Sequence, residues 1–167
     1  SAAELLDVIP EAFRIAEGGR PGPVLIDVPK DVQQEHAEFA HWPAPGCGYV
    51  PDPPDAALIG QAAAMIDAAR RPVLYLGGGV VKSGAQAEAV ALAERASLPT
   101  TTTLMALGTL PAGHPLALGM LGMHGARYTN QAIAECDLLI AVGARFDDRA
   151  TGRLERFCPQ AKVIHID

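Results

Sequence analysis

The sequence predicts an α/β fold in which helices cover both faces of a parallel sheet. Four short apolar runs alternate with segments whose apolar residues recur at helical spacing. Strands that are apolar on both sides are typical of parallel sheets buried between helices. The four runs are residues 72–76, 98–103, 137–143 and 162–167.

Composition and charge indicate a folded domain and argue against some classes of binding partner. The 167 residues correspond to about one domain, and a hydrophobic content of 49% with 19% charged residues is enough to bury a core. The net charge is −6, with no block of like charges, which argues against a nucleic-acid or anionic-membrane partner.

The cysteines and histidines predict neither a disulfide framework nor a metal site. Cys47, Cys136 and Cys158 are odd in number and far apart, and the histidines have no ligand spacing. No secretory signal opens the chain, so a reducing, cytoplasmic location is expected. The chain begins with Ser1 rather than Met, and we expect a piece of a longer protein.

The first 30 residues predict the tail of a preceding domain. Residues 10–18 have a proline near their start and a glycine stop, as in a short helix, and residues 23–29 form an apolar run closed by proline, as in a buried strand. One helix and one strand are too little to fold alone. Residues 31–54 are rich in proline and lack periodicity, so they predict a linker before a domain at 55–167.

Within this domain, helices and strands are expected to alternate. The helices are expected at about 55–69, 85–96, 127–135 and around Leu154. The chain stops at the end of its last predicted strand, and we expect the sheet to lack a final strand.

A long uncharged run covers residues 96–123. Its length raises the question of a membrane span. Pro99, Pro111 and Pro115 interrupt it, and Thr100–Thr103 favour a strand, so a lipid-facing helix is excluded. We expect loops that are buried or lie against an uncharged ligand surface.

The predicted ligand site lies at the carboxyl ends of the strands, where open parallel sheets bind ligands. Glycines there let the backbone approach a phosphate, and arginines supply forked donors for a pyrophosphate or carboxylate. Asp167 is placed to accept from ribose hydroxyls or an adenine amino group. The strand ends carry Gly77–Gly79, Thr103–Met105, Gly143–Arg149 and His165–Asp167.

The simple dinucleotide fingerprint does not hold. Gly77 and Gly79 supply G-x-G, but Lys82 occupies the third glycine position and no acidic residue follows about twenty positions later. The triplet could serve only a tight turn, and the cluster Arg145–Arg149 only an ion-pair network. His124 could likewise be a structural residue in an apolar loop. The residues alone indicate a nucleotide-binding α/β domain.

Three motifs add a resemblance. The segments Gly19–Gln33, Leu121–Gly125 and Arg145–Gly152 resemble the large catalytic subunits of acetolactate synthases (acetohydroxyacid synthases), which are thiamine-diphosphate enzymes. The first motif is common to many such enzymes, whereas the other two are specific. The resemblance implies a Rossmann-like central domain that binds FAD, between a pyrimidine-binding and a pyrophosphate-binding domain.

The resemblance also implies an activity for the parent enzyme. With thiamine diphosphate and magnesium it would decarboxylate pyruvate and join the two-carbon unit to pyruvate or 2-oxobutyrate, in branched-chain amino acid biosynthesis. The flavin would do no net redox chemistry. The family's catalytic glutamate and G-D-G motif lie in the flanking domains, so the isolated chain is expected to be inactive and to hold no metal. A homodimer or homotetramer with a regulatory subunit is implied.

The resemblance assigns roles to individual residues. Arg149 would pair with the carboxylate of the second 2-oxoacid. The substrate channel would include Lys30, Met123, Asp148 and Arg149. The FAD contacts would be Arg20, Gly77, Gly78, Gly79, Thr103, Leu104, Met105, Leu121, Gly122, His124, Gly143, Arg145, Asp147, Arg149 and Asp167.

Other functions remain open at this point. A glyoxylate carboligase also combines thiamine diphosphate with FAD, although the motifs around His124 and Asp148 favour the synthase. A nucleotide-binding module without catalysis, or a structural spacer that has lost its ligand, would use the same fold. Failure of any flavin to shift the melting temperature would favour the structural spacer. Formation of acetolactate from pyruvate by the full-length parent would distinguish the enzyme from the non-catalytic module.

Overall fold

The computed structural model describes residues 1–43 and 52–167. The chain divides into two compact units, Ser1–Pro53 and Pro54–Asp167. Residues 44–51, which include Cys47 and part of the predicted linker, lie outside the described residues.

The first unit contains α1 (Leu5–Glu17), preceded by a 3₁₀ turn at Ala2–Glu4, and the short α2 (Lys30–Gln33). The predicted start of the first helix at Pro10 is wrong, because Pro10 lies inside α1. Val8 and Ile9 extend the apolar face of the helix upstream of Pro10, so the helical pattern begins before the proline. The linker prediction also missed α2.

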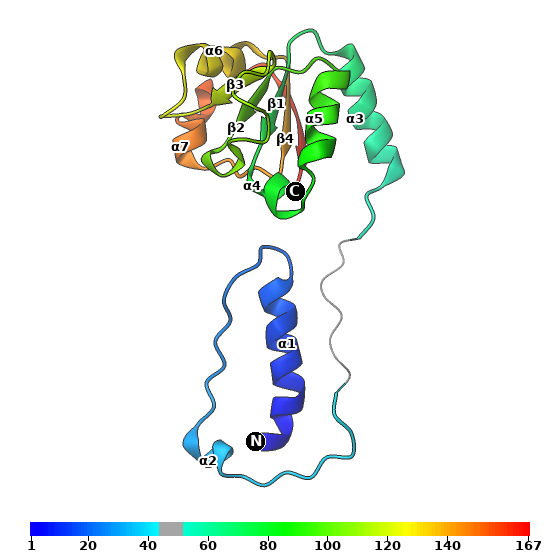
Figure 1. The fold of residues 1–167 in the computed structure, drawn as a ribbon, viewed down its shortest axis with the longest axis vertical. Helices are drawn as coiled ribbons and strands as arrows, with labels where there is room; N and C mark the ends of the chain where they lie inside the picture. Colours follow the sequence, from blue (N-terminus) through cyan, green and yellow to red (C-terminus); the bar gives the residue numbers. More distant parts are fainter. Residues whose placement is uncertain (44–51) are drawn as a thin grey trace. The chain divides into compact units, whose positions relative to one another are not determined.

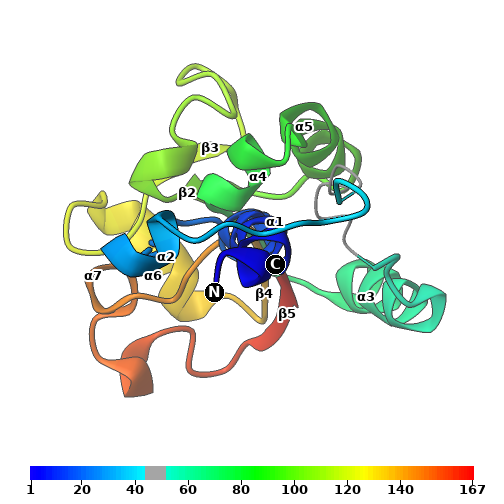
Figure 2. The same ribbon diagram turned by 90° about the horizontal axis from the view of Figure 1, so that it is seen from below.

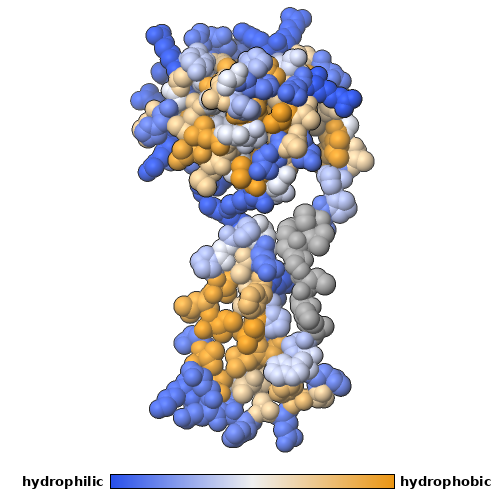
Figure 3. All heavy atoms as spheres, in the orientation of Figure 1, coloured by the Kyte–Doolittle hydropathy of each residue, from blue (hydrophilic) through white to orange (hydrophobic). Residues whose placement is uncertain are grey.

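The predicted strand at residues 23–29 is wrong. This segment belongs to no sheet in the described part of the chain, and the side chain of Leu25 is 88% exposed. An apolar run becomes a strand only where another strand accepts its backbone hydrogen bonds. Figure 3 shows the apolar side chains that consequently gather on the visible face of this unit.

The second unit alternates helices with strands, as predicted (Figure 1). Its strands are β1 (Pro72–Leu76), β2 (Thr100–Thr102), β3 (Ala117–Met120), β4 (Leu138–Val142) and β5 (Lys162–Ile166). Its α-helices are α3 (Ala56–Ala68), α4 (Gly78–Lys82), α5 (Gln86–Arg95), α6 (Arg127–Glu135) and α7 (Asp148–Thr151). Short 3₁₀ helices cover Leu104–Ala106 and Leu154–Arg156.

The five strands form one parallel sheet in the order β3-β2-β1-β4-β5. All four predicted strands are present, and β3 is a fifth that the sequence analysis placed in a loop. This edge strand contains Gly119 at φ +73°, and its register against β2 shifts at Thr100 and Thr101. A glycine-containing edge strand lacks the continuous apolar run by which buried strands are recognised.

Helices cover both faces of the sheet, which confirms the predicted α/β class (Figures 1 and 2). On one face Leu74, Leu76 and Ile140 form a core against which α3 and α5 pack. On the other face Tyr75, Leu139 and Ile133 form a second core beneath α6. Alternate residues of β1 and β4 therefore serve opposite cores, as strands buried on both sides require. In the described residues, no helix is long and apolar enough to cross a membrane.

Asp137 ties the first strand of this unit to β4. Its carboxylate accepts hydrogen bonds from the backbone N–H of Arg70 (2.8 Å) and of Arg71 (2.9 Å). The sheet register begins next to this contact, with Pro72 opposite Leu138. The two backbone donors hold the pKa of the Asp137 carboxyl below its ordinary value.

We predict that Asp137→Asn destabilises the second unit in a pH-dependent way. An amide has one acceptor oxygen for two donors, so stability falls at neutral pH. Because the folded state lowers the pKa of Asp137, the stabilisation is complete above the ordinary aspartate pKa and disappears as the pH falls through the lowered pKa. Urea unfolding at a series of pH values measures it.

The matched control is Asp67→Asn, at an exposed position of α3. This variant should track the unsubstituted chain at every pH. An Asp137→Asn curve parallel to that of the unsubstituted chain down to acid pH would contradict the role given to the carboxylate.

Candidate functional site

The order in which strands are added to the sheet reverses between two neighbouring strands, β1 and β4. From β1 the chain continues through α4 and α5 to β2 on one side, and β4 lies on the other side of β1. The turns that follow these strands are joined by hydrogen bonds from Gly77 N–H to the Val142 carbonyl (2.8 Å) and from Gly79 N–H to the Gly143 carbonyl (2.9 Å). A switch point of this kind is where parallel sheets bind ligands.

The glycines at this switch point are required by close backbone packing. A Cβ on Gly77 would lie 2.0 Å from the Gly143 carbonyl oxygen, and one on Gly79 would lie 2.6 Å from the Gly143 Cα. Gly143 itself has φ +57°, and a Cβ there would lie 2.6 Å from the Val80 nitrogen. These three glycines therefore bring the β1 and β4 turns together.

Gly78 differs from its two neighbours. A Cβ on Gly78 would meet the Met105 side chain at 2.9 Å, so this glycine faces the turn after β2 rather than the turn after β4. It is the first residue of α4, and in the described part of the chain its N–H donates to no backbone carbonyl. The predicted glycine turn is thus the start of a short helix with one unused donor.

The turn after β2 combines buried hydroxyls with exposed apolar side chains. Thr103 N–H donates to the Leu76 carbonyl (2.9 Å), which fixes the turn against β1. The hydroxyl oxygens of Thr102 and Thr103 are buried and have no hydrogen-bond partner in the described structure. Leu104 and Met105 are 67% and 70% exposed. Buried hydroxyls without partners are rare, so these two call for an explanation.

The turn after β4 carries the charged cluster Arg145–Arg149. Asp147 caps α7, since its carboxylate accepts from Ala150 N–H (3.0 Å). Among the described residues, neither Arg145 nor Arg149 forms an ion pair. The alternative of a structural ion-pair network is therefore not supported, and both guanidinium groups are available to a ligand.

The loop Leu121–Gly125 is held between α6 and α7. Asn130 of α6 accepts from Gly122 N–H (2.8 Å) and donates to the Gly122 carbonyl (3.0 Å). Met123 N–H donates to the Arg149 carbonyl (3.0 Å). Gly122 has φ +88°, and a Cβ there would lie 2.4 Å from the Arg149 carbonyl oxygen. The loop and the charged turn therefore have one fixed relative position.

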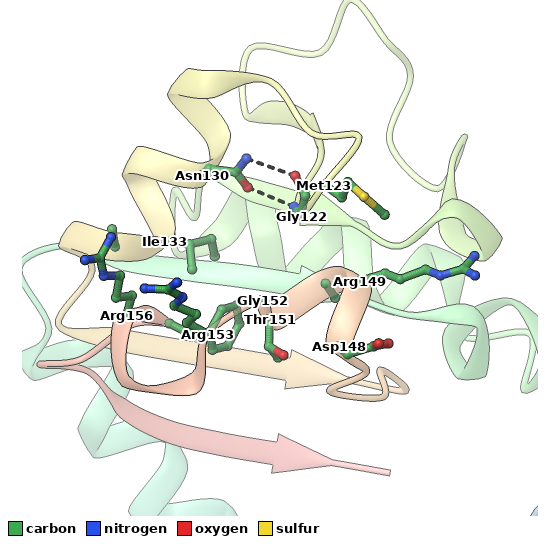
Figure 4. Close-up of a pocket in the computed structure, with 13 residues that line it drawn as sticks. Gly122, Met123, Asn130, Ile133, Asp148, Arg149, Thr151, Gly152, Arg153 and Arg156 are labelled. Atoms are coloured by element: carbon green, nitrogen blue, oxygen red, sulfur yellow. Dashed lines mark hydrogen bonds between the residues drawn. The ribbon is translucent and has the colours of Figure 1, made fainter.

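Between α6 and α7 lies a pocket of about 620 Å³ (Figure 4). In Figure 4, Met123, Asp148 and Arg149 lie at the end toward which the strands point, and Arg153 and Arg156 lie at the other end. Its lining also includes the apolar side chains of Ile133 and Phe157. The pocket thus brings together three of the four predicted channel residues, with Gly122 beside them.

Several lining residues escaped the sequence analysis. Asn130, Ile133, Arg153, Arg156 and Phe157 lie on α6 or beyond α7, outside the quoted motifs. Nothing in one sequence marks Asn130 as the partner of Gly122, because the pairing depends on where α6 packs.

The other predicted FAD and channel residues differ in their exposure and in the unit to which they belong. Asp167 and His124 are exposed, whereas Leu121 is buried in the core beneath α6, so its side chain is taken up by packing. Arg20 and Lys30 belong to the first unit. Their roles as FAD and channel contacts stay predictions.

The cysteines of the second unit are structural. Cys136 and Cys158 are both buried and free, and burial raises the pKa of Cys136 to about 12. A thiol with so high a pKa is not a nucleophile at neutral pH. Among the described residues, no three His, Cys, Asp or Glu side chains gather as metal ligands.

We predict that Gly77→Ala destabilises the second unit by about 1–3 kcal/mol, because the added Cβ overlaps the Gly143 backbone and the two turns must separate. Gly113→Ala is the control, since a Cβ at that position has open space and no positive φ opposes it. Urea unfolding measures both variants. Equal stability of the two variants would contradict the close contact between the turns.

Comparison with known proteins identifies the family. The family model for the central domain of thiamine pyrophosphate enzymes matches residues 59–167. The chain is 58% identical to the acetolactate synthase isozyme 1 large subunit of Escherichia coli, over 98% of this chain and 29% of the relative. It is 50% identical to the acetolactate synthase large subunit of Parasynechococcus marenigrum, over 99% of this chain and 27% of the relative.

A plant relative is similar over the same region. The chloroplastic acetolactate synthase 1 of Zea mays is 48% identical over 96% of this chain and 25% of the relative. The chain spans less than a third of the length of these relatives. The chain belongs to the thiamine pyrophosphate enzyme family, and its residues 59–167 are that family's central domain.

Proposed function

We propose that the second unit is the FAD-binding part of an acetolactate synthase large subunit. The observation that carries the proposal is the edge formed by the turns after β1, β2 and β4. Backbone donors and buried hydroxyls meet there with Arg145, which forms no ion pair within the described residues. The similarity to acetolactate synthase large subunits supports it.

The residues at this edge fit the parts of a flavin dinucleotide. The free N–H of Gly78 and the guanidinium of Arg145 suit the pyrophosphate. The Thr103 hydroxyl, buried without a partner, gains one from a polar ligand group. Exposed Leu104 and Met105 give a flat ring an apolar contact, and Asp167 would accept from ribose hydroxyls.

The flavin has a structural role in this proposal. It supplies an aromatic ring and a pyrophosphate that join neighbouring turns, and no net redox step is assigned to it. Within the described residues, Cys136 and Cys158 are buried and burial raises the pKa of both thiols, so neither offers a thiolate for redox chemistry at neutral pH.

The pocket between α6 and α7 is the proposed substrate channel of this unit. Three arginines and one aspartate line it, so its charge favours an anion such as a 2-oxoacid. Arg149 lies at the end nearest the strand tips, and its planar guanidinium would bind the substrate carboxylate with two parallel hydrogen bonds. His124 is a further proposed contact of the FAD. Lys30, which belongs to the first unit, is a further proposed residue of the substrate channel.

The parent enzyme would condense pyruvate with pyruvate or 2-oxobutyrate, releasing CO₂, in branched-chain amino acid biosynthesis. Thiamine diphosphate supplies the chemistry of decarboxylation when bound, together with Mg²⁺, and we assign no contact to either in this chain. A cytoplasmic homodimer or homotetramer with a regulatory subunit is the proposed assembly.

We predict that the 167-residue chain binds FAD in preference to FMN and NAD, and that Arg145→Ala weakens FAD binding about tenfold or more through the loss of a charge-assisted hydrogen bond. Flavin fluorescence and melting temperature follow the titration. Arg95→Ala is the control, because Arg95 is also an exposed arginine and lies in the last turn of α5.

Two results would oppose the proposal. Equal melting-temperature shifts with all three nucleotides would mean that the edge recognises no FAD-specific feature. Identical FAD affinity in Arg145→Ala and Arg95→Ala would remove Arg145 from the site.

A further inference from the structure

A cluster of aromatic rings surrounds Phe146, in the middle of the charged turn. Its ring meets Tyr75 with centroids 6.1 Å apart and Phe157 with centroids 6.0 Å apart. The His165 ring is closer, at 5.2 Å. The interplanar angles of 68°, 80° and 78° are edge-to-face, the arrangement that aromatic quadrupoles favour. The partners come from β1, from β5 and from the end of the segment after α7.

Two of these partners also hold the backbone that precedes Phe146. The Tyr75 hydroxyl donates to the Arg145 carbonyl at 3.5 Å. His165 Nε2 lies 3.1 Å from the Ala144 carbonyl, and because a carbonyl oxygen only accepts, this nitrogen carries the proton. The turn is thus held by its ring and by two consecutive carbonyls.

The Tyr75 hydroxyl is a permanent donor. Tyr75 is completely buried in β1, and burial, reinforced by the negative charge of Asp147, raises its pKa to about 12. The hydroxyl therefore keeps its proton throughout the neutral range. It lies where the charges of both Arg145 and Asp147 act on it.

Hydrogen bonds connect this turn to residues that line the pocket. Asp147 follows Phe146 and caps α7, and the Thr151 hydroxyl donates to the Asp147 carbonyl (3.0 Å). The Arg149 carbonyl then accepts from Met123 N–H (3.0 Å). Because these hydrogen bonds join the turn to α7 and to the loop, we expect a shift at Phe146 to displace Arg149 and the loop beside it.

Burial alone does not explain the ring. Phe146 is 36% exposed, whereas the core beneath α6 is closed by fully buried residues such as Leu139 and Ala141. Loss of a half-exposed side chain removes less apolar contact than loss of a core residue. What the phenylalanine adds at this position is a rigid plane with three directional contacts.

We propose that Phe146 is a positioning residue that fixes where Arg145 and Arg149 stand. The proposal rests on the proposed function, which gives these arginines their ligands, but its effect on the backbone is independent of any ligand. Substitution by leucine keeps an apolar side chain and removes the edge-to-face contacts, and substitution by tyrosine keeps them.

The test compares Phe146→Leu, Phe146→Tyr and the control Val163→Ala in the 167-residue chain. Val163 is 49% exposed on the same edge strand as His165 and contributes no ring. Amide hydrogen exchange is read at Ala150 and Met123, whose N–H groups bond to the turn, and in β1 and β4. FAD affinity is measured in parallel.

In Phe146→Leu we expect about tenfold faster exchange at Ala150 and Met123, unchanged exchange in β1 and β4, and about tenfold weaker FAD binding. Phe146→Tyr and Val163→Ala should match the unsubstituted chain. Unchanged exchange at the two amides in Phe146→Leu would overturn the proposal. So would faster exchange throughout the sheet, which would make the ring an ordinary core residue.

The two proposals fail in different ways. If the unsubstituted chain binds no FAD, the proposed function fails while the exchange pattern still decides the role of Phe146. If FAD binds and Phe146→Leu binds it equally well, only the positioning role fails.

Discussion

The contact between two pieces of backbone organises the second unit. Gly77 and Gly79 after β1 lie against Gly143 after β4 with no room for a Cβ on any of the three. Only glycine permits this approach, and the approach lets Gly79 N–H reach the Gly143 carbonyl across the two turns. The strand order of the sheet reverses between β1 and β4. The contact between their turns therefore forms part of the edge at which a ligand can touch the turns after β1, β2 and β4.

A chain of fixed contacts leads from this edge to the pocket. The turn after β4 is held by Tyr75 and His165, and it ends in the Asp147 cap of α7. From α7 the Arg149 carbonyl binds the loop at Met123, where Gly122 allows the close approach. The proposed FAD edge and the proposed channel are consequently two sides of one turn. A substitution in the turn is expected to affect both.

The sequence was sufficient where a pattern is local. Residues 72–76 and 127–135 were predicted with the bounds that β1 and α6 have, because apolar runs and helical periodicity mark buried elements. The apolar run at residues 23–29 predicted a strand that the structure does not contain, because a strand also needs a neighbouring strand from elsewhere in the chain. Edge strand β3 contains Gly119 and has no continuous apolar run, so its sequence pattern is weak. Asn130 acts through its contact with Gly122, and Phe146 acts through contacts with β1 and β5. These contacts arise only from packing. The roles of Arg20, Lys30 and the other predicted ligand contacts stay predictions.

The central claim is that the glycine-lined edge is where FAD binds. Backbone amide chemical shifts of the 167-residue chain, recorded with and without FAD, test it most directly. The account predicts that the largest changes fall on residues 77–79, 103–105 and 143–147, with the amino ends of the strands unaffected. Changes confined to α3 or to the amino ends of the strands would contradict it, since a ligand there would not touch the backbone contact that builds the edge.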